Sequence, residues 1–192
     1  MTESHTDLRE RLRSQIEEAY CKALYTYTTQ HKAANLKERG FRLISIAQIL
    51  LTSISSVSFI SMLVTYQNVA TVLAGLCSVV SLALNLYSRG RDYPTEIELH
   101  RSSADELWPV MQDYVSLLTD FDDLDIWSIR ENRKLLQDRL ESIYKRSPAT
   151  NSKAYLLAQK ALKQEAEQTF EIGECDRYLP VGIRRSGDKA SS

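Results

Sequence analysis

The residue types that most often carry out chemistry are scattered along this chain. His5, His31 and His100 are far apart, and no histidine and carboxylate are placed to activate a serine or a cysteine. The sequence contains no Walker loop and no GxGxxG, GxSxG or HExxH motif. We therefore interpret each histidine as a solvated helix residue. We predict that the chain is not an enzyme and uses no cofactor.

One acidic run, residues 120–125, has the density of carboxylates that calcium loops use. Counted from Asp120, Glu131 occupies the twelfth position of an EF-hand loop, as that motif requires. The fifth position is Leu124 and the sixth is Asp125, where the tight turn needs glycine. The calcium pattern fails, and we interpret the run as an acidic loop that favours the positive end of the next helix.

More informative polar residues lie in the longest apolar block, residues 43–88, which contains no Asp, Glu, Lys, Arg or His. Polar or small residues recur in this block at steps of three and four, so each series occupies one face of a helix. The amides of Gln48 and Asn85 need hydrogen-bond partners if they lie in lipid. The first series is Ser45, Gln48, Thr52 and Ser55, and the second is Thr71, Gly75, Ser78, Ser81 and Asn85.

The apolar block is long enough for two membrane-spanning helices, because one span needs about 20 apolar residues. Gln67-Asn68 divides it into spans over 43–66 and 69–88. A buried hairpin in a soluble helical bundle is the alternative, but a soluble core helix usually has a charged face. Hydroxyl groups are compatible with lipid, because they can bond to carbonyls of the preceding turn.

Basic residues flank the block on both sides. Lys37, Arg39 and Arg42 precede it, Arg89 and Arg91 follow it, and the loop between the spans carries no charge. The positive-inside rule then places both flanks and both termini in the cytosol, with the tip of the hairpin on the other side. We predict a multi-pass protein in contact with membrane lipid.

The rest of the chain is predicted to be helical, because there are only 6 Gly and 4 Pro among 192 residues and strand signals are scarce. We expect helices over 6–37, 95–119 and 151–170, with Pro109 causing a kink or a break. Another helix is expected to begin at the capping-box pattern Ser128-Ile129-Arg130-Glu131. The formal net charge of -1 argues against direct binding of nucleic acid.

The predicted fold is all-α, a two-helix transmembrane hairpin with a cytosolic helical bundle. It has an N-terminal amphipathic helix over 1–42, the hairpin over 43–88, C-terminal cytosolic helices over 89–175 and a flexible tail over 176–192. The polar faces of the hairpin have two interpretations. They could seal the two helices together, or they could line a water-filled path, which would require several hairpins to assemble.

The order of these parts resembles the SLATT family, the two-transmembrane effectors of bacterial and archaeal conflict systems. The resemblance covers about residues 17–170. It rests on the amphipathic helix, on Arg42 before the hairpin and Arg89-Gly90-Arg91 after it, and on a helix containing His100-Arg101 and Leu107-Trp108.

The resemblance implies a homo-oligomeric pore former of the bacterial inner membrane in antiviral defence by abortive infection. It also implies an upstream trigger, either a cyclic oligonucleotide as in CBASS-like systems or a sensor protein. The alternative from the residues alone is a membrane-anchored scaffold or signalling adaptor whose cytosolic helices bind a partner protein.

Overall fold

The structure is a computed structural model that describes residues 2–65, 68–170 and 174. Within these residues every regular element is a helix, which confirms the all-α prediction. The five helices are α1 (Thr2–Thr65), α2 (Asn68–Arg89), α3 (Tyr93–Thr119), α4 (Ile126–Arg146) and α5 (Ser152–Lys163). The predicted tail over 176–192 and the loop residues 66 and 67 lie outside the described residues.

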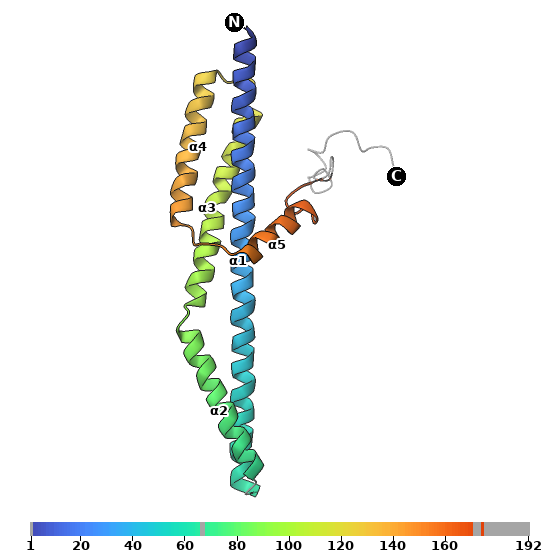
Figure 1. Ribbon diagram of the computed structural model, residues 1–192, viewed down its shortest axis with the longest axis vertical. Coiled ribbons are helices and arrows are strands. Elements are labelled where there is room, and N and C mark those ends of the chain that lie inside the picture. The colour runs from blue at the N-terminus through green and yellow to red at the C-terminus, as the bar shows by residue number, and fades with distance from the viewer. Residues whose placement is uncertain (1, 66–67, 171–173, 175–192) are drawn as a thin grey trace, which may run out of the picture.

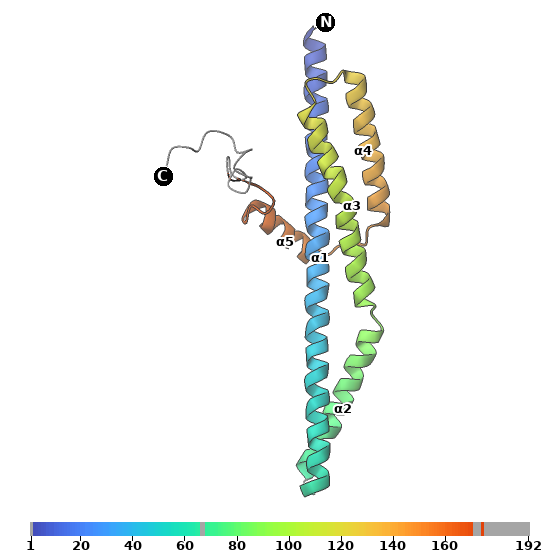
Figure 2. The same ribbon diagram turned by 180° about the vertical axis from the view of Figure 1, so that it is seen from behind.

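Helix α1 runs the whole length of the molecule (Figure 1). It joins the predicted N-terminal helix and the first apolar span into one element of 64 residues, roughly 96 Å long at 1.5 Å per residue. Helix α2 lies beside its C-terminal third, and α3 and α4 lie beside its N-terminal half, as both views show (Figure 2). We call the pair formed by residues 43–65 and α2 the hairpin, and residues 2–42 with α3, α4 and α5 the bundle.

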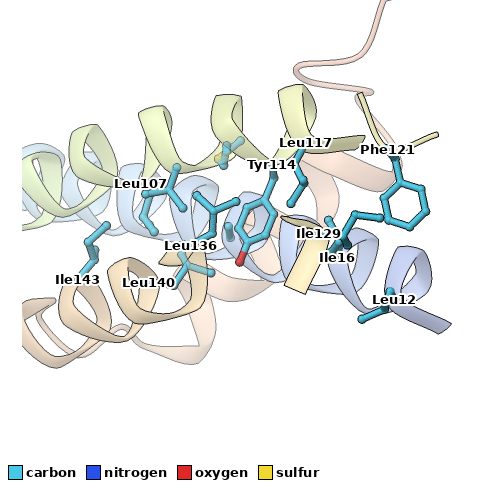
Figure 3. Close-up of a cluster of buried hydrophobic side chains, with 13 residues drawn as sticks. Leu12, Ile16, Leu107, Tyr114, Leu117, Phe121, Ile129, Leu136, Leu140 and Ile143 are labelled. Atoms are coloured by element: carbon cyan, nitrogen blue, oxygen red, sulfur yellow. The ribbon is translucent and has the colours of Figure 1, made fainter. Parts of the chain in front are cut away.

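The bundle has one main apolar core (Figure 3). Helix α1 contributes Leu12 and Ile16, α3 contributes Leu107 and Tyr114, and α4 contributes Leu136, all at most 4 % exposed. These positions recur at helical spacing, so one stripe of each helix faces the same core. Full burial of a leucine or isoleucine side chain contributes about 1.5–3 kcal/mol. This core holds α3 and α4 on the charged half of α1.

The hairpin has no comparable core. Large apolar side chains on its outer surface are exposed, with Leu43 at 69 % and Val79 at 68 %. Two of the described helices are long and apolar enough to cross a membrane. In the most apolar stretch of each helix, almost no residues are buried within the protein. The alternative of a buried hairpin inside a soluble bundle does not describe this arrangement.

Proline and aspartate set the start of α3. A short break separates α2 from α3, since α2 ends at Arg89 and α3 begins at Tyr93. The Asp92 carboxylate accepts a hydrogen bond from the Thr95 amide at 3.3 Å, which caps the new helix. Pro109 does not break α3, which continues to Thr119.

The predicted capping box at Ser128 is wrong. The N-cap of α4 is Asp125, whose Oδ1 accepts from the Trp127 amide at 2.8 Å and the Ser128 amide at 3.0 Å. A carboxylate satisfies both free amides, and the Ser128 hydroxyl donates to it rather than to the backbone. The acidic loop therefore stabilises the positive end of a helix, as interpreted from the sequence.

The last helix is shorter than predicted. Helix α5 ends at Lys163, while the sequence indicated helix as far as residue 170. Ala166 and Gln168 have positive φ angles of 50° and 66°, which are incompatible with a continuing right-handed helix. Helical composition alone did not reveal this turn.

Candidate functional site: the hairpin seam and its junction with the bundle

The first contact between the hairpin helices lies near its open end. The Gln48 amide donates to Asn85 Oδ1 at 3.4 Å and to Ser88 Oγ at 3.3 Å. The Ser88 hydroxyl in turn donates to the Asn85 carbonyl at 3.2 Å. The nitrogen of the Gln48 amide and the oxygen of the Asn85 amide, which would be costly to expose to lipid, therefore have partners across the two helices.

A second contact lies deeper in the hairpin. The Ser55 and Ser78 hydroxyl oxygens are 3.4 Å apart, and Ser55 also lies 3.5 Å from the Ala74 carbonyl. Ser78 donates to the same Ala74 carbonyl at 2.8 Å. We call Gln48, Ser55, Ser78, Asn85 and Ser88 the seam. Small hydroxyl side chains at such positions let the backbones of two helices approach closely.

Other predicted hairpin residues bond within their own helix or lie at the surface. Ser45 and Thr52 donate to carbonyls of their own helix, at Phe41 and Gln48, at 3.0 and 2.8 Å. Thr71 and Gly75 lie on exposed parts of α2, and a Cβ added at Gly75 would meet no atom within 4 Å. Gly75 is thus not a close-approach position in the single chain.

Two hydroxyls that the sequence prediction omitted extend the polar surface. Ser53 donates to the Ile49 carbonyl at 2.8 Å, and Ser56 donates to the Thr52 carbonyl at 2.9 Å. With Thr52 they form an exposed strip of hydroxyls on α1. Their spacing of one, three and four residues was visible in the sequence, but the choice of face depended on where α2 packs. The hairpin therefore has one polar face turned inward and a second, on α1, turned outward.

The basic residues at the open end make different contacts. Lys37 forms an ion pair with Glu96 on α3, and this interaction lowers the pKa of Glu96. Arg42 lies 3.6 Å from Glu38, and the Arg91 guanidinium lies over the Tyr87 ring, 5.4 Å from its centroid. Among the described residues, Arg39, Arg89 and Arg91 have no ion-pair partner. None of these three guanidinium groups is held in an ion pair, and Arg91 stacks on Tyr87 and lies close enough to Glu96 to attract its charge.

The family-like motifs of α3 attach that helix to α1. Arg101 pairs with Glu38 at 2.8 Å, Leu107 is fully buried in the core, and the Trp108 ring lies 5.8 Å from that of Tyr27. None of these residues points to a reaction centre. They fix the bundle against the helix that continues into the hairpin.

His100 was predicted to be solvated, and this is wrong. The side chain is 1 % exposed, and its Nδ1 lies 2.5 Å from Gln30 Oε1. The Gln30 amide donates to the Pro148 carbonyl at 3.2 Å, so its oxygen is the acceptor and His100 Nδ1 is the donor. Burial lowers the pKa of His100, with Lys37 contributing in the same direction. His100 thus connects α3 through α1 to the segment before α5.

His31 was likewise predicted to be solvated, but it is only partly exposed. Its ring packs edge-on against Tyr27 with centroids 4.6 Å apart, and burial lowers its pKa. The side chain of His5 lies outside the described residues. In the part of the chain that the structure describes, no group of three or more His, Cys, Asp or Glu could hold a metal ion.

A helical hairpin with an apolar outer surface and a polar seam, continuous with a helical bundle, defines a membrane-associated protein with two candidate spans. Residues 12–174 match the family of SMODS and SLOG-associating 2TM effector domains, family 4, and the chain belongs to that family. The family implies a membrane effector in defence systems. No curated protein and no solved structure matches the chain.

Proposed function

We propose that this protein is an oligomeric effector that permeabilises the bacterial inner membrane in nucleotide-signalled antiviral defence, ending in abortive infection. The observation that carries the proposal is the family match over residues 12–174. In this proposal the hairpin crosses the membrane twice, and both termini are cytoplasmic because the basic flanks stay inside. No catalytic step and no cofactor is assigned.

Assembly is needed because one hairpin cannot enclose a path. Its seam is occupied by hydrogen bonds between α1 and α2, so water would have to pass between copies. The outward strip formed by Thr52, Ser53 and Ser56 offers hydroxyls to a neighbouring copy or to water. Their own hydrogen bonds to the preceding turn let this strip face lipid before assembly.

The continuous α1 supports a mechanical link between trigger and membrane. The bundle core and the hairpin share this helix without a break between residues 37 and 43. A cyclic oligonucleotide or a sensor protein that moved α3 and α5 against α1 would also move the hairpin. The trigger in this proposal acts on the bundle and the response occurs in the membrane.

The test is inducible expression in bacteria, with growth and entry of a membrane-impermeant dye followed together. Dye entry that precedes loss of growth is expected for the native chain when its trigger is present. Replacing Ser53 and Ser56 together by Leu removes two of the three hydroxyls of the outward strip without touching the seam, and it should abolish dye entry while the protein level in membranes stays unchanged. Ile49→Leu on the same helix is the matched control and should leave dye entry intact. Dye exclusion under every trigger tried refutes the proposal.

A second candidate function is that of a membrane-anchored scaffold or adaptor. It is favoured by apolar side chains on the outer side of α4, where Trp127 is 70 % and Leu135 is 59 % exposed. If the hairpin is only an anchor, a foreign two-span anchor in place of residues 43–88 preserves function. A pore former loses its activity in that exchange.

A further inference from the structure

A cavity lies where the bundle meets the hairpin. It has a volume of about 500 Å³ and is lined by α1, by the start of α3 and by the segment leading into α5. Its floor includes Ala33, Leu36 and Gly40 of α1, whose small or aliphatic side chains leave room. Cavities of a few hundred Å³ are the usual size of small-ligand sites.

The rim of this cavity is cationic. Lys37, Arg91 and Lys153 line it from three separate parts of the chain. Lys37 pairs with Glu96, whose charge also attracts Arg91, and Lys153 has no ion-pair partner among the described residues, so three positive charges face one carboxylate. Asn151 also lines the cavity and caps α5, which places the positive end of that helix at the rim.

A buried polar side chain also lines the cavity. His100 is 1 % exposed and uses Nδ1 to donate to Gln30, which leaves Nε2 without a partner among the described residues. The charged groups around it are Lys37 from α1, Arg91 before α3, Glu96 on α3 and Lys153 on α5. With Nδ1 donating to Gln30, Nε2 of the neutral ring carries a lone pair, so His100 donates to an anion only after the ring takes up a second proton. The negative charge of an anion bound beside the ring favours that uptake and offsets the repulsion from the cations.

The cavity lies at the level expected for lipid headgroups. Gly40 precedes the apolar block by three residues, about 4.5 Å along the helix axis. The headgroup layer on each side of a bilayer is roughly 5–8 Å thick. Arg91 approaches from the other helix of the hairpin, two residues beyond the end of α2. A phosphate in that layer can therefore reach the rim.

We propose that this cavity is a binding site for a phosphate group, held by Arg91, Lys153 and His100. The source is either the headgroup of an anionic phospholipid or a soluble phosphate ester, and the position at the membrane surface favours the lipid. The inference goes beyond the proposed function and does not depend on it, because binding does not require a pore. Occupancy would join α1, α3 and α5 at one point beside the hairpin.

The test uses the full chain purified in detergent and titrated calorimetrically with three probes: short-chain phosphatidylglycerol, short-chain phosphatidylcholine and ATP. Saturable binding of phosphatidylglycerol is expected, and phosphatidylcholine should bind more weakly because its choline cation meets the cationic rim. Arg91→Gln and Lys153→Gln should each weaken binding by roughly tenfold, the range of one charged hydrogen bond. Arg89→Gln and Arg39→Gln remove the same charge at the same level outside the cavity and should bind as the native chain does.

Each outcome has a defined meaning. Binding of phosphatidylglycerol with this pattern of variants supports the site with a lipid source, and binding of ATP with the same pattern supports it with a soluble source. A shift of the His100 ring signals in NMR spectra on binding, which requires about tenfold more probe in Arg91→Gln, is a second expected result. The proposal is overturned if no probe saturates, or if the cavity variants and the control variants bind alike.

Discussion

The buried pair formed by His100 and Gln30 makes the sharpest prediction about the bundle. Replacing His100 by Leu leaves Gln30 Oε1 without its hydrogen-bond donor. The Gln30 side chain is only 2 % exposed, so water cannot replace that donor. A buried polar atom left without its partner costs about 1–3 kcal/mol. For a protein of this length about 1 kcal/mol lowers Tm by roughly 2–4 °C, so the expected loss is roughly 2–12 °C.

The assay is thermal unfolding followed by circular dichroism on the purified chain in detergent, above the ordinary histidine pKa of 6.5. Glu98→Leu, on an exposed position of the same helix, is the matched control and should change stability by less than about 0.5 kcal/mol. The double variant His100→Leu with Gln30→Leu removes both buried polar groups. It should be less destabilised than the sum of the two single variants.

A loss of stability in the double variant that is smaller than the sum of the two single losses would establish that the two side chains interact as the structure shows. If His100→Leu melts at the same temperature as Glu98→Leu, the pair contributes nothing and the reasoning is refuted. Strictly additive effects of the two single variants would contradict it as well.

Three further predictions concern pH, the seam and the core. Burial lowers the pKa values of His100 and His31, so below pH 6.5 the unfolded chain binds more protons than the folded chain. The free energy of unfolding should therefore fall as the pH is lowered. Melting temperatures measured against pH should show a shallower decrease for His100→Gln than for the native chain. A double-mutant cycle with Gln48→Leu and Asn85→Leu, measured by unfolding in detergent, should give a coupling free energy of about 0.6 kcal/mol. The value is small because the 3.4 Å hydrogen bond between the two side chains is long. Zero coupling would argue against the seam. Tyr114→Phe should stabilise the bundle by about 1 kcal/mol in chemical denaturation, because the buried Tyr114 hydroxyl has no hydrogen-bond partner among the described residues. Burial also raises the pKa of Tyr114 to about 12. A loss of stability in this variant would show that the hydroxyl has a partner.

Much of the fold followed from hydrophobic pattern. A charge-free block between basic flanks predicted the hairpin, and the scarcity of Gly, Pro and strand signals predicted the bundle helices. The continuity of α1 was not predicted, because the amphipathic pattern ended near residue 37 and the charge-free block began only at residue 43. The helix continues through Gly40, at a cost of about 1 kcal/mol relative to alanine.

The candidate site was predicted in part. Helical spacing placed Gln48, Ser55, Ser78 and Asn85 on faces that the structure brings together, but it could not say which hydroxyls face outward. That distinction depends on the rotation of each helix about its axis, which is set by tertiary packing. His100 was missed for the same reason, since a single histidine in a charged helix has no local signal of burial.

Release of a trapped dye from liposomes containing the purified protein tests the central claim most directly. A pore-forming oligomer predicts release that rises more steeply than linearly with the protein-to-lipid ratio and is lost when residues 43–88 are exchanged for a foreign two-span anchor. Liposomes that stay sealed at every ratio, with lysate from phage-infected cells added as a source of trigger, would contradict the account. Equal release by the exchanged chain would contradict it too.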